Sequence, residues 1–262
     1  FAGYYWRIIR INSNGSIRMI YDGTSAHANG ESSADRYYGA NQFNPTYDDN
    51  MYVGYMYTQG EVHGTGVSSI IKIANDKFYA NKLSSYASKL DTNAGFCGDR
   101  STLSTQNDVG TAKEVTYYKG YLRVEESTPT LICENASDYY TVTSASAGNK
   151  KLSYPIGLIT ADEVMLAGHG GGIFDGNMNH GEYNPISYLN IGYSFWTMTP
   201  VGYYIPYLTN FMESRVFNIY DTGMIGDYYV YSTEESLRPV INLKSDVTIT
   251  GSGTMTNPYV VN

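Results

Sequence analysis

The pattern of apolar and polar positions at the start of the chain predicts a β-hairpin. Residues 4–11 (YYWRIIRI) and 16–21 (SIRMIY) are rich in aromatic and β-branched side chains, with polar residues between them. Asn12-Ser13-Asn14-Gly15 separates the two runs. An Asn-Gly pair in this position is typical of a hairpin turn, because both residues tolerate the left-handed backbone that such turns require. We therefore expect two antiparallel strands here.

Apolar positions at three- and four-residue steps predict a helix after Ser68 or Ser69, either of which can act as its N-cap. The apolar positions of this helix are Ile70, Ile71, Ile73, Ala74, Phe78, Leu83, Tyr86 and Leu90. We expect one of its faces to be buried. A second, shorter helix should follow Thr160, because Thr160 and Glu163 have the spacing of a capping box. Gly168 should end it, since glycine readily adopts the backbone conformation found after a helix.

The rest of the chain is expected to alternate between loops and strands. Loops with short strands are predicted for residues 22–66, and loops for residues 91–113 and 144–151. Strands are predicted for residues 115–124, 130–133, 193–199, 216–220, 228–231, 237–243, 247–250 and 258–261. We assign Trp6 and Trp196 to the core, because each lies in an apolar strand. Strands at both ends with helices between them are typical of an α+β domain. We treat residues 1–262 as one such domain, with mixed or antiparallel sheets, two main helices and long loops.

The composition narrows the classes of function. The chain of 262 residues has 28 tyrosines and a formal net charge of −8, with only 17 lysines and arginines. Nucleic-acid binding needs basic side chains clustered on one face, so nucleic acid is not expected as a partner. Tyrosine combines a stiff ring with a hydroxyl, which suits a recognition surface. The chain has no apolar run of transmembrane length. Its start at Phe1 leads us to expect a mature or excised ectodomain, extracellular or at the cell surface.

Cys97 and Cys133 are the only cysteines of the chain. They do not form a C-x-x-C motif, so neither a zinc site nor a dithiol redox centre is expected. The alternatives are a disulfide and a pair of buried free thiols, and we favour the disulfide. In the chain-entropy model, a disulfide that closes the loop between these two cysteines stabilises the fold by roughly 3–4 kcal/mol. Such a bond fits an oxidising, extracellular setting.

A glycine-rich stretch follows the second expected helix, and several interpretations of it stay open. Asp175, Asn177 and Asn179 alternate as the oxygen ligands of a calcium loop do, but no glutamate closes that loop. Alternatively, His169 and His180 join Asp175 in a transition-metal site. The interpretation that we favour is a loop without a metal, so no cofactor is expected.

The sequence offers no clear catalytic motif. It has neither a G-x-S-x-G elbow nor a Walker lysine. Its paired carboxylates are direct neighbours, which in a strand would point to opposite faces of the sheet. These pairs are Asp48-Asp49, Glu125-Glu126 and Glu234-Glu235. We therefore name no catalytic residue and expect a protein without enzymatic activity.

Several segments, in chain order, resemble a family of surface proteins and predicted exported proteins of gut-associated bacteria. The matching segments are residues 1–21, 95–101, 154–168, 195–200 (FWTMTP) and 237–261, which begins LRPVINL. The tryptophan strand followed by this terminal strand is similar to the C-type-lectin-like fold of formylglycine-generating enzymes and of the variable proteins of diversity-generating retroelements. The resemblance implies a C-type-lectin-like fold, in which the terminal strand pairs with the sheet near the N-terminus.

The two groups that share this fold imply different functions. Formylglycine-generating enzymes hold copper with a cysteine pair late in the chain, whereas no cysteine follows Cys133 here, so that activity is not expected. In the variable proteins, the stretch between the tryptophan strand and the last strand forms the ligand face, and substitutions concentrate there. The resemblance therefore implies that the corresponding stretch of this chain, within residues 183–231, forms a ligand face.

Residues 183–231 also stand out by composition. They include ten tyrosines and, as their only basic residue, Arg215. Segments with Tyr, Asn and Ser next to turns resemble antibody paratopes in composition. The candidate ligand-binding residues are Tyr203, Tyr204, Tyr207, Asn210, Arg215, Asn218, Tyr228, Tyr229 and Tyr231. We expect that replacing Tyr203, Tyr204 and Tyr207 by Ala abolishes partner binding and leaves Tm nearly unchanged.

Together these observations predict an extracellular, non-catalytic recognition or adhesion domain that binds a protein or a glycan on another cell or on a host surface. Two other classes stay open. One is a structural or tip subunit of a bacterial surface filament, in which the tyrosine surface packs against neighbouring copies. The other is a hydrolase whose catalytic residues the sequence does not mark.

Overall fold

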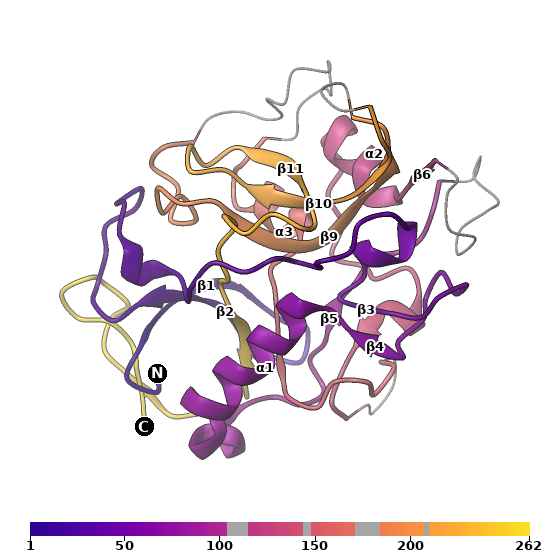
Figure 1. Cartoon of the computed structure of the whole chain (residues 1–262). Coiled ribbons are helices and arrows are strands. Elements are labelled where there is room, and N and C mark those ends of the chain that lie inside the picture. Colours follow the sequence, from indigo (N-terminus) through magenta and orange to yellow (C-terminus); the bar gives the residue numbers. More distant parts are fainter. Residues whose placement is uncertain (104–114, 144–147, 171–183, 207–209) are drawn as a thin grey trace.

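The structure, a computed structural model, describes residues 1–103, 115–143, 148–170, 184–206 and 210–262. These residues form an α+β fold with mostly antiparallel sheets, as expected (Figure 1). The α-helices are α1 (Ile70–Lys82), α2 (Lys119–Glu126) and α3 (Ala161–Leu166). The 3-10 helices are η1 (Ala34–Arg36), η2 (Asn50–Val53), η3 (Ser84–Lys89) and η4 (Ala136–Asp138).

The first sheet brings together the two ends of the chain. Its strands, in spatial order, are β1 (Tyr5–Ile11), β2 (Ile17–Gly23), β12 (Val240–Leu243) and β8 (Ile156–Gly157), and all neighbours are antiparallel. The expected hairpin is confirmed. The Gly15 N–H donates to the carbonyl oxygen of Asn12 (2.9 Å), and Gly15 has a φ of +81°, which glycine adopts without strain. The pairing of β12 with β2 confirms the arrangement expected for the terminal strand.

The second sheet contains the tryptophan strand. Its strands, in spatial order, are β11 (Ile225–Tyr229), β10 (Glu213–Ile219), β9 (Phe195–Tyr204) and β6 (Thr116–Tyr117). β9 continues past its expected end at Thr199, because residues up to Tyr204 stay paired with β10. Smaller two-stranded sheets pair β3 (Met56–Tyr57) with β4 (Val67–Ser68), β5 (Phe96–Cys97) with β7 (Tyr139–Tyr140), and β13 (Ile249–Thr250) with β14 (Val260–Val261).

Helices α1 and α3 begin where the sequence predicts. Ser69 is the N-cap of α1, and Thr160 and Glu163 form the capping box of α3. α1 is shorter than expected, because it ends at Lys82 and the 3-10 helix η3 continues the chain to Leu90. The local start signals are therefore confirmed, and only the length of α1 differs.

The strand expected for residues 115–124 is wrong for most of its length. Of these residues, only those of β6 form a strand, which pairs with β9, and α2 starts at Lys119. The same run fits a helix, because Gly120 and Val124 lie four residues apart and are both buried. The strand expected for residues 130–133 is not formed either, and these residues follow an irregular path.

The core consists of two buried apolar clusters. One packs the first sheet against Phe78 of α1. The other extends from the middle of the molecule to the second sheet around Trp196, which is fully buried and donates from Nε1 to the carbonyl oxygen of Asn41 (2.8 Å). The expected core position is confirmed for Trp196, whereas Trp6 is only partly buried against the first cluster.

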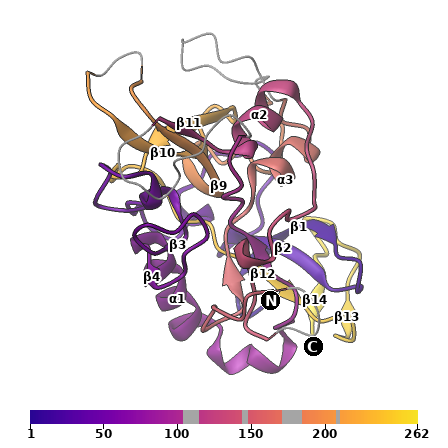
Figure 2. The same cartoon turned by 90° about the vertical axis from the view of Figure 1, so that its right-hand side faces the viewer.

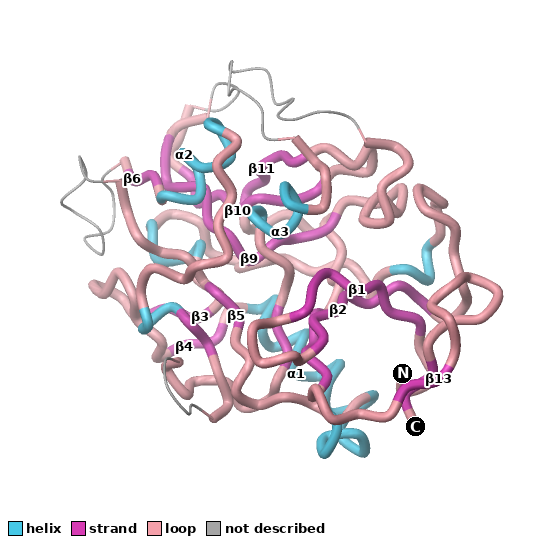
Figure 3. Tube along the Cα trace, turned by 180° about the vertical axis from the view of Figure 1, so that it is seen from behind, coloured by secondary structure: helices cyan, strands magenta, loops and turns pink. Residues whose placement is uncertain are grey.

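The second sheet and α1 lie at opposite ends of the molecule. In Figure 1, β9, β10 and β11 lie at the top and α1 at the bottom, and Figures 2 and 3 show the same separation. The N- and C-termini lie side by side, away from the second sheet, in all these views. Both contact the segment after α1: Phe1 packs on Tyr86 with 5.3 Å between ring centroids, and Lys89 Nζ donates to an oxygen of Asn262.

Candidate functional site

The structure places part of the expected ligand face in the interior. Tyr203, Arg215 and Asn218 are buried, with 3%, 5% and 0% of their surface exposed. The Tyr203 hydroxyl donates to the carbonyl oxygen of Asp48 (3.0 Å), and Asn218 Nδ2 donates to Glu235 Oε2 (3.0 Å). These side chains support the sheet from within, so we no longer count them as ligand contacts. Replacing Tyr203 by Ala would therefore lower Tm, contrary to the expectation for the triple tyrosine variant.

Arg215 is the centre of a buried ion cluster. Its Nη2 lies 2.9 Å from Asp227 Oδ1, and its Nη1 is paired with Glu213. Burial alone would lower the pKa of the guanidinium, but Asp227 and Glu213 raise it above its ordinary value. The Tyr204 hydroxyl donates to Asp227 Oδ2 (2.5 Å), and burial raises the pKa of Tyr204 well above that of a free phenol. Arg215 is thus anchored beneath the surface, and the hydroxyl of the partly exposed Tyr204 is anchored to the same cluster.

The other expected residues lie near the ends of β10 and β11. Tyr207 lies outside the described residues, and Asn210 is exposed just before β10. Tyr228, Tyr229 and Tyr231 are partly exposed. The ring centroids of Tyr228 and Tyr229 are 4.2 Å apart, and those of Tyr229 and Tyr231 are 4.3 Å apart. The structure therefore brings these tyrosines together at the surface.

Tyr47 extends this group of rings. Its ring centroid lies 4.5 Å from that of Tyr231 and 5.8 Å from that of Phe211, which is 46% exposed. We call Tyr47, Tyr228, Tyr229 and Tyr231 the aromatic strip, and Phe211 lies at its Tyr47 end. The sequence analysis missed Tyr47, because it lies in a loop far along the chain from β10 and no local pattern links the two.

Backbone pairing fixes the strip on the second sheet. The Ser214 N–H in β10 donates to the carbonyl oxygen of Tyr47 (2.9 Å), so the loop that carries Tyr47 lies along this strand. Arg215 of β10 is the direct cross-strand partner of Tyr229 in β11. Cross-strand partners project from the same face of a sheet. The aromatic strip therefore lies next to the buried ion cluster.

The hydroxyl groups of Tyr228 and Tyr231 are held in their neutral form. Burial and Glu213, whose Oε2 accepts a hydrogen bond from the Tyr231 hydroxyl (3.1 Å), raise the pKa of Tyr231 to about 12. The Tyr229 hydroxyl donates to that of Tyr228 (3.4 Å), and this contact raises the pKa of Tyr228 above its ordinary value. A neutral phenol both donates and accepts hydrogen bonds. Tyr228 and Tyr231 thus offer polar groups without a charge.

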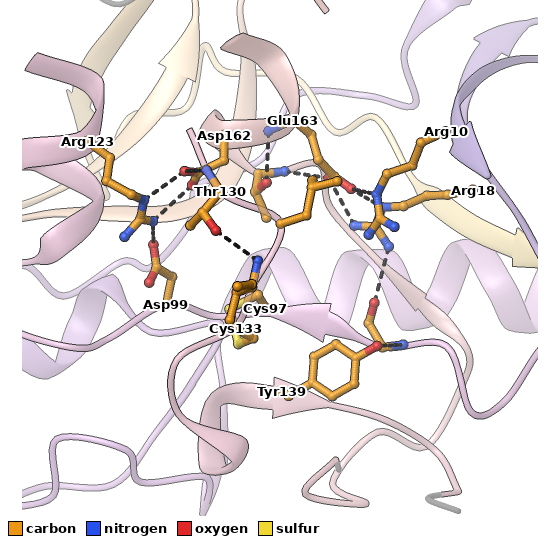
Figure 4. Close-up of a pocket in the computed structure, with 14 residues that line it drawn as sticks. Arg10, Arg18, Cys97, Asp99, Arg123, Thr130, Cys133, Tyr139, Asp162 and Glu163 are labelled. Atoms are coloured by element: carbon orange, nitrogen blue, oxygen red, sulfur yellow. Dashed lines mark hydrogen bonds and ion pairs between the residues drawn. A yellow bond between two sulfur atoms is a disulfide. The ribbon is translucent and has the colours of Figure 1, made fainter. Parts of the chain in front are cut away.

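A small polar cavity lies next to the first sheet (Figure 4). Its volume is about 30 Å³, which is room for one or two water molecules. In Figure 4 the guanidinium groups of Arg10 and Arg18 both point to Glu163, and that of Arg123 points to Asp162. The N–O distances are 2.9 Å for Arg10, 2.5 Å for Arg18 and 2.7 Å for Arg123. The positive and negative side chains that line this cavity neutralise one another. We therefore interpret this cluster as structural.

The disulfide lies beside the same cavity. Cys97 and Cys133 are bonded, which confirms the favoured alternative (Figure 4). The Thr130 N–H donates to Asp162 Oδ1 (3.0 Å), so both ends of the segment 130–133 are fixed over the buried charges. Burial raises the pKa of Asp99, another lining residue, to about 7. The bond thus joins β5 to the segment that precedes η4, beside these buried charges.

The metal sites considered above fall mostly outside the described residues. Of the candidate metal ligands, four lie outside the described residues: Asp175, Asn177, Asn179 and His180. His169 is buried, with Nδ1 2.5 Å from the carbonyl oxygen of Gly223 and Nε2 2.5 Å from Ser187 Oγ. Burial lowers the pKa of His169, so the ring is a neutral link between two loops. In the described part of the chain, no group of three or more His, Cys, Asp or Glu side chains could hold a metal ion.

Neither a family model nor a curated protein nor a solved structure matches the chain. The helices in the described ranges are all too short or too polar to cross a membrane. The molecule is thus an α+β protein with a disulfide and an aromatic surface strip, and the C-type-lectin-like fold stays a prediction.

Proposed function

We propose that the chain is an extracellular or cell-surface recognition domain without catalytic activity, with a C-type-lectin-like fold, that binds a protein or a glycan through the aromatic strip. The observation that carries this proposal is the strip itself, in which partly exposed rings from separate segments are held in contact on one sheet. The disulfide supports an oxidising location. The resemblance to the variable proteins of diversity-generating retroelements also supports a ligand face within residues 183–231, which include most of the strip.

Rings that already touch lose little freedom when a ligand arrives. Ordering a flexible side chain at an interface costs about 0.5–1.5 kcal/mol. In the free chain, Tyr229 and Tyr231 are already stacked, with 25° between the ring planes. Tyrosine also provides large contact area together with a hydroxyl that orients polar groups of a partner. The strip is therefore a preorganised surface for recognition.

The proposal is tested by removing rings from the strip. The labelled chain is applied to a glycan array and is used to select binders from a displayed library of short random peptides. We expect ligands whose affinity falls by about tenfold or more when Tyr47 and Tyr229 are both replaced by Ala. Tyr231 is left in place, because its hydroxyl is bonded to buried Glu213 and its loss would also change stability.

Tyr259→Ala is the matched control. Tyr259 is 46% exposed and lies just before β14, in the part of the molecule away from the second sheet. This variant should bind every ligand as the wild type does. Ligands that bind the double variant as tightly as the wild type would contradict the proposal. A size that grows with concentration in gel filtration, and that the double variant loses, would favour the filament subunit instead.

A further inference from the structure

Three rings of the strip, those of Tyr228, Tyr229 and Tyr231, are oriented so that they cover much of one another's faces. The planes of Tyr229 and Tyr231 differ by 25° at a centroid distance of 4.3 Å, and those of Tyr228 and Tyr229 differ by 31° at 4.2 Å. Rings so close and so nearly parallel leave mainly their edges and hydroxyls to a ligand. A sugar ring needs an open aromatic face to stack on. The geometry therefore favours a partner with many hydrogen-bonding groups, such as a polypeptide, over a glycan.

Exposed carboxylates flank the strip. Asp48 directly follows Tyr47 and is exposed. Glu234 is also exposed, and it lies close enough to Tyr228 to contribute to the raised pKa of that hydroxyl. A partner that approaches the strip therefore meets negative charge near both of its ends.

The buried ion cluster beneath the strip also contains more negative than positive groups. The carboxylates of Glu213 and Asp227 share the single guanidinium of Arg215. Arg215 is the only Lys or Arg between residues 183 and 231, and it is buried. The ion cluster thus leaves an excess of negative charge below the rings, and such a field attracts cations.

We propose that the ligand of the aromatic strip is a basic polypeptide segment, whose Lys or Arg side chains pair with Asp48 and Glu234. This inference rests on the recognition function proposed above and narrows it to a peptide or protein with positive charge. The N–H groups of Lys and Arg donate to the carboxylates and to the tyrosine hydroxyl oxygens. Their apolar stems pack along the ring edges. The segment's backbone supplies further donors and acceptors to the hydroxyls.

The first arm of the test uses the peptides selected from the displayed library. The selected pool should be enriched in Lys and Arg over Asp and Glu. The tightest binder is then synthesised together with a twin in which every Lys and Arg is replaced by Glu, and both are titrated by fluorescence anisotropy. The twin should bind about tenfold more weakly or worse. Affinity for the basic peptide should fall as NaCl is added, because salt screens exposed charges.

The second arm removes the proposed charge partners. The variant Asp48→Asn with Glu234→Gln should lose about fivefold or more in affinity for the basic peptide. The control variant Glu61→Gln with Asp246→Asn changes the net charge equally, at exposed positions outside the second sheet, and should bind as the wild type does. Equal losses in both variants would mean that net charge alone attracts the peptide, which would overturn the inference.

Failure of this inference differs from failure of the recognition function. If glycans or acidic peptides are the tightest ligands and the Tyr47→Ala, Tyr229→Ala variant loses them, the recognition function stands and the basic ligand is overturned. A selection that yields no peptide overturns the basic ligand as well. If the tyrosine variant keeps every ligand at wild-type affinity, both proposals are overturned.

Discussion

The aromatic strip and the aromatic cluster around Phe78 contain the same kinds of side chain, but they differ in what lies against the rings. The rings packed around Phe78 are those of Tyr4, Trp6, Tyr21 and Tyr38, at centroid distances of 4.7–6.4 Å. Most of them meet Phe78 at 73–78°, edge to face, and Phe78 is fully buried. Edge-to-face contacts let several rings enclose one ring. In the strip the rings lie in a row, with 25–42° between the planes of neighbours, and this arrangement encloses none of them. One group therefore forms core and the other forms surface.

The first and second sheets also differ in the balance of their buried charges. In the first sheet, arginines are in the majority around one carboxylate. Asp22 is paired there with Arg7, Arg36 and Arg238. In the second sheet, carboxylates are in the majority around Arg215, and the hydroxyls of Tyr204 and Tyr231 donate to them. Tyrosine thus acts there as a neutral donor in place of arginine, which accounts for part of the tyrosine excess without any role in binding.

The largest effect that separates the two ends is expected for Phe78→Ala. Loss of a fully enclosed ring should lower the free energy of unfolding by about 3–5 kcal/mol, because the surrounding rings cannot close the cavity. Urea denaturation measures this difference. At a temperature where the variant is folded, the strip should bind its ligands with wild-type affinity. A folded Phe78→Ala variant that no longer binds would show that the two ends do not act independently.

A smaller effect, a gain in stability, is expected when Glu235, beside the second sheet, is replaced by Gln. Burial raises the pKa of Glu235 from 4.5 to about 7. Between these values the unfolded chain releases a proton that the folded chain keeps, so stability falls as the pH rises through this window and is then constant. Glu235→Gln removes this titration. The variant should exceed the wild type in stability by about 1–3 kcal/mol above pH 7 and equal it near pH 4.

The amide of the Glu235→Gln variant also has an acceptor nearby. Glu235 Oε2 accepts from Asn218 Nδ2, and Asn218 Oδ1 has no hydrogen-bond partner among the described residues. The new amide N–H can donate to that oxygen. Thermal unfolding of both proteins across the pH range provides the measurement. Parallel stability curves for variant and wild type would contradict the assignment of this pH dependence to Glu235.

The same contrast explains what the sequence could predict. The turn at Gly15 and the capping box of Thr160 and Glu163 are local signals, because the interacting groups lie within a few residues of each other. Helix α2 was missed, because its apolar spacing fits a strand as well as a helix and only its packing decides. Helices and strands were thus predicted best where interactions between residues close in sequence determine the conformation.

The candidate site depends on contacts between distant parts of the chain. Tyr47 reaches the strip through the pairing of its carbonyl oxygen with Ser214, which no local pattern marks. The burial of Arg215 had a partial signal, since Glu213 lies two residues before it on the same strand and such residues share a face. That spacing favours an internal ion pair over a ligand contact. Composition marked the tyrosine-rich region 183–231, but only tertiary contacts distinguish its buried from its exposed tyrosines.

The smallest effects on stability and affinity should distinguish two kinds of tyrosine in the second sheet: those whose hydroxyl is bonded to a buried group, and those whose hydroxyl faces a ligand. The Tyr204 hydroxyl donates to buried Asp227 (2.5 Å), so Tyr204→Phe should cost about 1–2 kcal/mol of stability and leave ligand affinity unchanged. The Tyr229 hydroxyl donates only weakly, to that of Tyr228 (3.4 Å), so Tyr229→Phe should cost less than about 0.5 kcal/mol. Because the strip presents hydroxyls and edges, Tyr229→Phe should still weaken a selected peptide by about two- to fivefold. Paired measurements of urea denaturation and peptide affinity on both variants provide the check, and the reverse pattern would remove the distinction between the two kinds of tyrosine.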